Sequence, residues 1–466
     1  TAEYKENPGR AIFNLASDSI KAIFDNSVSM VASFDDSFMG RQGLKVLFTH
    51  PSAWWPGAKK SVIDFIKTLG GHETIDAMKA DIYSRPNFIN GFYQKAGIIA
   101  AYEEQYPANL AERAPIIGRV FKASEAAFVG SGMRMRADLY DLLADQAKSN
   151  GQDVSDQKEF IEPVGKLINN LTARGSWGKY HGESRVTKLI LWAPKMLMAN
   201  INTLVGVDYW TNLRNPFARR EAGLNWLKVI GTTALIMAIA SAMGDDDEPI
   251  VEWDPRSSDF GKLKFGDTRF DITGGMGSIV VLAARIITGK RKSATTGIVT
   301  PYESGFGRQS RFDAIVDFLV NKNPPPTAIL RDWFKGETPT GERFTPTGAA
   351  YRAMTPIAAQ NFIKLKDNAS VDRLAGAIVD VFGINTSSYS DSERQWNPNG
   401  SQREQKLYQR VGEKRFQELN KEYNTRVDSH IKELKRDPTW QRMSDEDKQA
   451  KLDKGRERIK AYYLGK

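Results

Sequence analysis

The sequence predicts a mainly α protein: an elongated multi-helix body, a small β-hairpin insertion and a charged C-terminal helical tail. Three observations lead to this prediction. The apolar residues Val62, Phe65, Ile66 and Leu69 recur at the three- and four-residue spacing of an amphipathic helix. The first half shows little sustained alternation of polar and apolar residues, so strands are not needed to explain it. Residues 401–466 carry a narrow apolar stripe on a heavily charged helix.

The composition excludes several kinds of chemistry. Of the 466 residues, 41% are apolar and 26% are charged, which is enough for a sizeable core. The absence of cysteine removes disulfides, thiolate metal sites and cysteine nucleophiles. The four histidines form no metal-binding spacing, so we expect no metal and no cofactor; they are His50, His72, His181 and His430. The net charge of +9 suits a protein near nucleic-acid or lipid phosphates, and it equally suits simple solubility.

Capping and breaking residues bound the helices expected in the first half. Ser124 can cap a long helix that ends at Asn150-Gly151. Another helix is expected from about residue 156 to residue 171. Residues 188–205 are apolar again, and Pro194 is a kink point within them.

Changes in composition divide the chain into four regions. We expect an N-terminal helical domain over residues 1–180, followed by apolar helices with a short β-hairpin over residues 181–295. Residues 296–400 are rich in glycine and proline and predict an extended connector with short helices, such as one from Phe312 to Val320. Residues 401–466 form the charged helical tail.

The hairpin is predicted from two short alternating segments. Residues 262–265 and 268–272 alternate polar and apolar side chains, and Gly266-Asp267 lies between them. A two-residue connection that contains glycine is typical of a tight β-hairpin.

The tail carries its own helix signals. Asp437 precedes Pro438, a pattern typical of an N-cap followed by proline in the first helical turn. Ser444 with Asp447 resembles a capping box. The irregular spacing of the stripe does not support a long coiled coil, so we expect this helix to pack on another protein or on another helix of its own chain; the stripe comprises Leu407, Val411, Phe416, Leu419 and Tyr423.

The segment from Val229 to Gly244 contains no charged residue. As a helix it would be about 24 Å long, short of the ~30 Å hydrocarbon core of a membrane. Extension back to Leu224 adds a turn in which Lys228 can snorkel to the interface. Two interpretations remain open, a buried core helix and a membrane-competent helix. In the second, the residues expected to meet the membrane are Trp226, Ile230, Leu235, Ile236 and Ile239.

We expect Leu224–Gly244 to be covered by neighbouring helices while the protein is packaged, so that a membrane role requires its release. A second apolar stretch, Ser278–Thr288, carries a single charge at Arg285. Basic residues flank both stretches and are candidates to contact lipid phosphates or DNA, with plain solvation as the alternative; they are Arg214, Arg219, Arg220, Lys290, Arg291 and Lys292.

Known catalytic motifs are absent from the sequence. It contains no phosphate-binding loop of the Walker type and no nucleophile elbow, and residues 274–277 lack the spacing of a dinucleotide fingerprint. Glu183-Ser184 and Glu303-Ser304 match the acid of lytic transglycosylases over two residues only, without the rest of that signature. We therefore expect a protein that is not an enzyme.

Four strings together resemble a known family. They are SFDDSFMGRQGLKVLFTHPSAWW (33–55), PVGKLINNLTARGSWG (163–178), RREAGLNWL (219–227) and WDPRSSDFGKLKFGDTRFDITGGMGSIVVLAARIITGKRKS (253–293). They are similar to the large polyvalent-protein-associated segments of giant proteins from tailed bacteriophages. The resemblance covers residues 10 to 345 and supplies no catalytic residue that can be transferred to this chain.

The resemblance implies a segment of a longer phage polypeptide, consistent with a start at Thr1 that does not look like a natural N-terminus. Some such giants are internal virion proteins, packaged in the capsid near the portal and ejected with the genome into the host envelope. The expected partners are other copies of this chain, portal or ejection proteins, genomic DNA and the host membrane. Two alternatives remain: a non-catalytic scaffold of a virion-associated or antirestriction polyprotein with an enzyme domain upstream, and a capsid or tail protein that is never ejected.

Overall fold

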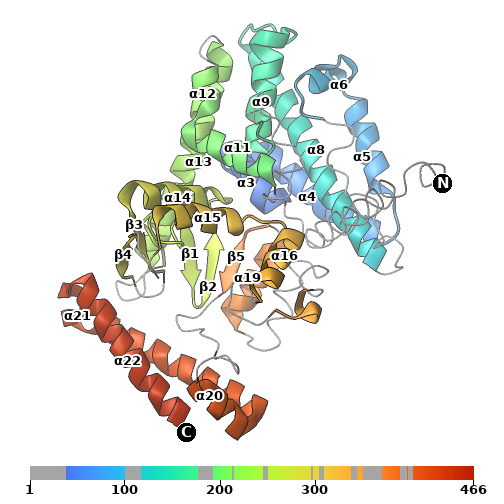
Figure 1. The fold of residues 1–466 in the computed structure, drawn as a ribbon. Helices are drawn as coiled ribbons and strands as arrows, with labels where there is room; N and C mark the ends of the chain where they lie inside the picture. The colour runs from blue at the N-terminus through green and yellow to red at the C-terminus, as the bar shows by residue number, and fades with distance from the viewer. Residues whose placement is uncertain are drawn as a thin grey trace, which may run out of the picture.

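The predicted mainly α fold is confirmed in the described residues (Figure 1). A body of packed helices adjoins a smaller region built around a three-stranded sheet, and two long helices of the tail lie beside that region (Figure 1). The computed structural model describes residues 38–99, 117–176, 191, 193–212, 215–244, 250–294, 297–303, 309–336, 344–349, 370–381, 383–388, 396 and 402–465.

The helical body is organised around the long helix α8, Ile117–Ser149. It is preceded by η1 (Phe38–Gln42, a π-helical turn), α3 (Leu44–Thr49), α4 (Pro51–Leu69), α5 (Thr74–Tyr83), α6 (Pro86–Ile89) and α7 (Phe92–Lys95). It is followed by η3 (Gln157–Ile161) and α9 (Glu162–Leu171). The predicted end of α8 is confirmed by Gly151, whose φ is +74°. The predicted start was wrong, because the helix is already continuous before Ser124.

Helix α4 packs on α8 through small and polar side chains. Its buried positions are Ala53, Gly57, Ser61 and Asp64. The Ser61 hydroxyl donates a hydrogen bond to the Ala127 carbonyl oxygen of α8 at 3.2 Å. The predicted helix is confirmed, but its apolar face points outward, and Ile66 is 62% exposed. The small residues allow the close approach, so packing and not hydrophobicity sets the orientation of α4.

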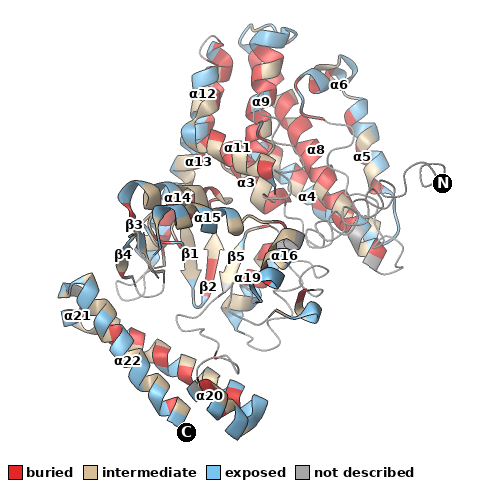
Figure 2. Cartoon of the chain, in the orientation of Figure 1, coloured by how far each residue is buried: buried red, intermediate tan, exposed pale blue. Residues whose placement is uncertain are grey.

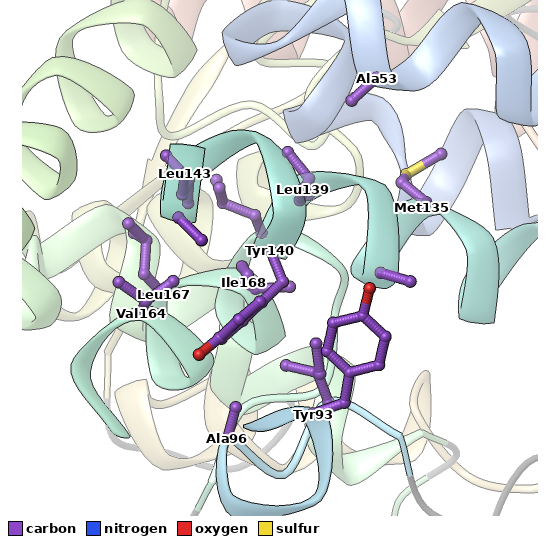
Figure 3. Close-up of a cluster of buried hydrophobic side chains, with 14 of the residues drawn as sticks. Ala53, Tyr93, Ala96, Met135, Leu139, Tyr140, Leu143, Val164, Leu167 and Ile168 are labelled. Carbon is purple, nitrogen blue, oxygen red and sulfur yellow. The ribbon is translucent and has the colours of Figure 1, made fainter. Parts of the chain in front are cut away.

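The main hydrophobic core lies between α8, α9 and the segments around α7. Leu139 and Leu143 of α8 are fully buried beside Ile168 of α9 (Figure 3). Edge-on aromatic contacts extend this core, with 5.4 Å between the rings of Tyr93 and Tyr140. Buried residues concentrate along α8 and α9, whereas the tail exposes most of its surface (Figure 2).

Three further helices pack onto this core from residues beyond 180. They are α11 (Pro194–Val205), α12 (Val207–Thr211) and α13 (Pro216–Met243). Helix α11 packs on α9, and α13 packs on α3 and α9, so contacts cross the domain boundary expected at residue 180. Pro194 begins α11 and does not kink it, because its missing N–H belongs to the first turn, where no hydrogen bond is lost.

The predicted hairpin is confirmed. Strand β1 (Lys262–Phe265) pairs antiparallel with β2 (Thr268–Asp271), and Gly266 adopts a φ of +57° in the turn between them. Strand β5 (Thr386–Ser388) adds to the other edge of β2, a pairing that the sequence pattern did not predict. Strands β3 (Lys290–Lys292) and β4 (Val299–Pro301) form a separate two-stranded ladder.

Four helices accompany the sheets: α14 (Met276–Thr288), α15 (Arg311–Val320), α16 (Pro325–Lys335) and α19 (Val371–Val381). Helix α15 confirms the helix expected at residues 312–320. It begins with a capping box in which the Ser310 hydroxyl and the Asp313 carboxylate each bond the other residue's backbone N–H.

The tail forms a helical hairpin of α20 (Gln402–Arg436), the short α21 (Pro438–Arg442) and α22 (Asp445–Gly465). Asp437 caps α21 through the Thr439 N–H at 2.9 Å, as expected from its sequence. The stripe of α20 packs against α22 of the same chain, with Leu407, Leu419 and Tyr423 almost fully buried. Of the two expected occupants, another helix of the same chain therefore covers the stripe.

Candidate functional site

Helix α13 is the candidate site, because its N-terminal half is anchored in the main core while one of its faces is exposed. Its first residue after the cap is Pro216, and the Asn215 side chain accepts a hydrogen bond from the Ala218 N–H at 2.8 Å. Phe217 lies in the main core, 6.0 Å from the Phe160 ring. The N-terminal half of α13 is therefore fixed to the helical body.

The remainder of α13 presents an apolar stripe to solvent. We define this exposed stripe as Leu224, Leu227, Gly231, Leu235, Ile239 and Met243, residues three or four apart on one helix face. Leu235 is 59% exposed, Ile239 54% and Met243 75%. Soluble proteins seldom leave several large aliphatic side chains exposed in a row, so this face is suited to meeting an apolar partner.

The described part of the chain contains one helix long and apolar enough to cross a membrane, and it is α13. Its most apolar 18-residue window is only 17% buried. Among the described residues, helices of this chain do not cover Leu224–Gly244, and the expected cover by neighbouring helices in the packaged state stays a prediction. In the parts of the chain that the structure describes, the opposite face of α13 is the packed one, where Met237 and Ala240 contact Val251.

The five residues expected to meet a membrane divide between the two faces of α13. Leu235 and Ile239 lie in the exposed stripe, while Ile230 and Ile236 are half-buried. Trp226 is 37% exposed, and its indole N–H donates to the Leu204 carbonyl oxygen at 3.3 Å. An indole that bonds the protein at one edge and exposes its ring suits the boundary between apolar and polar surroundings.

The basic residues before α13 do not converge. The Arg219 guanidinium lies 4.8 Å from the centre of the Tyr209 ring and donates to the Tyr209 hydroxyl at 2.8 Å. Arg220 is exposed and lines a cavity of about 290 Å³ with His50 and Lys228. Arg214 lies outside the described residues. Of the two described members of this group, Arg220 is the one available to an anionic surface.

The basic residues after α14 form strand β3. Lys292 pairs with Glu252 at 2.7 Å, and Arg291 donates to the Thr300 hydroxyl at 3.2 Å and to the Gln309 side chain. Lys290 is exposed and aligns with Pro301 in the ladder. Lys292 and Arg291 thus support the local fold, and Lys290 remains available to phosphates.

A buried polar network that sequence reasoning missed lies beneath α13. The Lys45 ammonium, on α3, is 3% exposed and donates to the Asn170 carbonyl oxygen, the Asn200 side chain and the Thr203 hydroxyl, the last two at 3.2 Å. Asn170 in turn donates to the Asp208 carboxylate at 2.8 Å. The sequence did contain a signal for this network, the lysine inside the apolar run LKVLF, since a lysine among core residues usually has buried partners.

Burial lowers the pKa of Lys45 from 10.5 to about 7, partly opposed by the charge of Asp208. Burial raises the pKa of Asp208, opposed by its bond from Asn170 and by the Lys45 charge. Both groups are thus driven toward neutrality, as expected for ionisable groups in a poorly solvated interior. We interpret the role of the network as structural, because its hydrogen bonds join the four helices α3, α9, α11 and α12.

Lys45 should make stability depend on pH. Between pH 7 and pH 10.5 the unfolded chain binds a proton on Lys45 that the folded chain does not, so folding becomes more favourable as pH rises. Relative to a Lys45→Met variant, wild type should gain about 1 kcal/mol of unfolding free energy per pH unit in this window. Urea titrations at several pH values measure the difference, and parallel pH dependences of the two proteins would contradict it.

The described residues contain no group of histidine, aspartate and glutamate side chains arranged to hold a metal ion. Comparisons with protein-family models, curated proteins and solved structures found no match for this chain. The exposed stripe of α13 is therefore the feature on which a functional proposal rests.

Proposed function

We propose that this chain is a structural segment of a bacteriophage internal virion protein, delivered with the genome, whose α13 contacts the lipid of the host envelope. The observation that carries the proposal is the exposed stripe, an apolar face on an apolar helix whose other end is fixed in the main core. The resemblance of its four strings to giant phage proteins supports the phage part of the proposal.

The stripe can act without the release step expected from the sequence. Leu224, Leu235 and Ile239 already face solvent, so a membrane can be met by the folded protein. Burying one such side chain in an apolar phase contributes about 1.5–3 kcal/mol. Arg220 and Lys290, both exposed, can add attraction to anionic head groups of about 1 kcal/mol each. Full insertion of α13 would still require its buried face, with Met237 and Ala240, to separate from Val251.

Liposome flotation tests the lipid contact. The full chain is mixed with phosphatidylethanolamine–phosphatidylglycerol vesicles at moderate salt, and wild type should float with them. The double variant Leu235→Asp/Ile239→Asp should lose at least about tenfold in partitioning, because two charges would enter the apolar contact. Ile66→Asp is the matched control, an equally exposed aliphatic residue on α4, and should float like wild type.

Unchanged flotation of the double variant would contradict the assignment of the contact to α13. A wild-type chain that stays with the unbound protein would contradict a lipid contact altogether. The delivery part is tested separately by mass spectrometry of DNA-emptied particles. Full retention of the chain in emptied particles would show that it is not ejected.

A further inference from the structure

A cavity of about 330 Å³ lies away from the exposed stripe, between α11, the start of α14 and the end of α15. Three cationic side chains from separate parts of the chain line it: Arg41 from η1, Lys262 from β1 and Lys322 from the loop after α15. Asp271 is the one carboxylate among the described lining residues. The lining therefore carries a net positive charge, which disfavours a metal cation and favours an anion.

Within the part of the chain that the structure describes, the three cations are incompletely neutralised. Lys322 contacts the Phe318 ring with its ammonium 5.5 Å from the ring centre, and no hydrogen bond or ion pair joins this ammonium to the described residues. Arg41 lies 4.0 Å from the Asp380 carboxylate, its one ion-pair partner among the described residues. Lys262 is held by Asp259 at 3.3 Å. Lys322 and Arg41 thus retain donors that a bound anion can satisfy.

The charges that face Lys322 explain why it needs a counterion. Burial lowers the pKa of Lys322, and the neighbouring Arg41 charge lowers it further, while Asp271 raises it. Asp271 forms no ion pair with Lys322 among the described residues, and its Oδ1 accepts from the Thr273 N–H at 2.8 Å and from the Thr273 hydroxyl. An anion placed between Arg41 and Lys322 would compensate two cations at once.

Part of the cavity wall is a glycine turn held by Asn200. Gly274 and Gly275 have φ values of +60° and +87° and carry no side chain into the space. Asn200 fixes this turn by donating to the Gly274 carbonyl oxygen at 3.0 Å while its own oxygen accepts from Lys45. The volume far exceeds the ~30 Å³ of one water molecule, so a phosphate and part of an attached group fit.

We propose that this cavity binds a phosphoryl group, with Lys322 and Arg41 as its principal ligands and Lys262 at its edge. The shared chemistry is a phosphate that is either free or the head group of a lipid. The site is separate from the stripe of α13, and its occupation does not depend on the membrane contact proposed above.

Isothermal titration calorimetry of the full chain at low salt tests the site with two probes. Inorganic phosphate represents the free anion, and dihexanoyl phosphatidic acid, kept below its micelle concentration, represents a lipid head group. Lys322→Gln should weaken binding by roughly tenfold to a hundredfold, because one charge-assisted contact is lost. Binding of phosphatidic acid alone would assign the site to a lipid head group, and binding of both probes to phosphate in general.

A second pair of variants keeps the test valid if Lys322→Gln does not fold. Ser278 lines the cavity in the first turn of α14, where aspartate is favoured by the helix dipole. Ser278→Asp should therefore fold well yet abolish binding, since it places a negative charge beside the anion. Ser278→Asn, of the same size and neutral, should bind within about threefold of wild type. The proposal is wrong if neither probe binds at millimolar concentration, or if Ser278→Asp binds as well as wild type.

Discussion

Replacement of Asp64 by alanine should lower the free energy of unfolding by about 3–5 kcal/mol. The Asp64 carboxylate of α4 pairs with the Arg134 guanidinium of α8 inside the interface of these helices. The two side chains are only 12% and 8% exposed. Removing the carboxylate would leave a guanidinium poorly solvated and without its partner, which costs more than the ion pair itself contributes. Urea denaturation followed by circular dichroism measures the change.

The double variant Asp64→Ala/Arg134→Met is the control for this prediction. It removes the uncompensated charge together with its partner, so it should recover much of the lost stability. Glu418→Ala provides a comparison at the surface, where the Arg415 pair is about half exposed and should contribute less than about 1 kcal/mol. A loss for Asp64→Ala no larger than that of Glu418→Ala would refute the role given to the buried pair.

The second large effect is expected for Gly165→Ala in α9. A methyl group at this position would collide with the backbone of Ala96, at 2.8 Å from its carbonyl carbon and closer still to its oxygen. A main-chain neighbour cannot rotate away, so α9 would have to shift from the core that Ile168 and Leu167 build. We expect a loss of about 3 kcal/mol or more, at the upper end of overpacking effects.

Gly231→Ala is the matched substitution. Gly231 also lies inside a helix, but a methyl group there would meet no atom within 4 Å. Because alanine is the better helix former, this variant should gain up to about 1 kcal/mol. Thermal unfolding of both variants separates the two effects. Equal shifts for Gly165→Ala and Gly231→Ala would mean that the contact with Ala96 does not restrain α9.

Turn and capping residues were sufficient to predict those elements whose structure depends on residues close by in the sequence. The Gly266-Asp267 turn, the Asp437 cap and the helix at residues 312–320 all follow from residues a few positions apart, and all three are confirmed. The stripe of the tail was also predicted, although its partner was left open; that partner is α22, which follows α20 after the short helix α21. These features need no knowledge of the distant chain.

Long-range contacts explain what could not be predicted. The apolar residues of α4 did not show which face of the helix is buried. Ser61 and Asp64 bond to partners on α8, far along the sequence, so the polar face lies inside. Strand β5 joins β2 across more than a hundred residues. The hydrogen bonds of Lys45 to Asn170 and Asn200 likewise become visible only after three helices have met. The phage assignment and the membrane contact stay predictions.

The anchoring of α13 limits how deep it can go into a bilayer. Beyond the buried Val229, the helix continues to Met243 with its stripe exposed and its opposite face packed through Met237 and Ala240. At 1.5 Å per residue this part is about 20 Å long, less than the ~30 Å apolar thickness. An intact protein could therefore wedge into the outer leaflet without reaching the inner one. Such a wedge enlarges the area of one leaflet only, so its binding should favour strongly curved membranes.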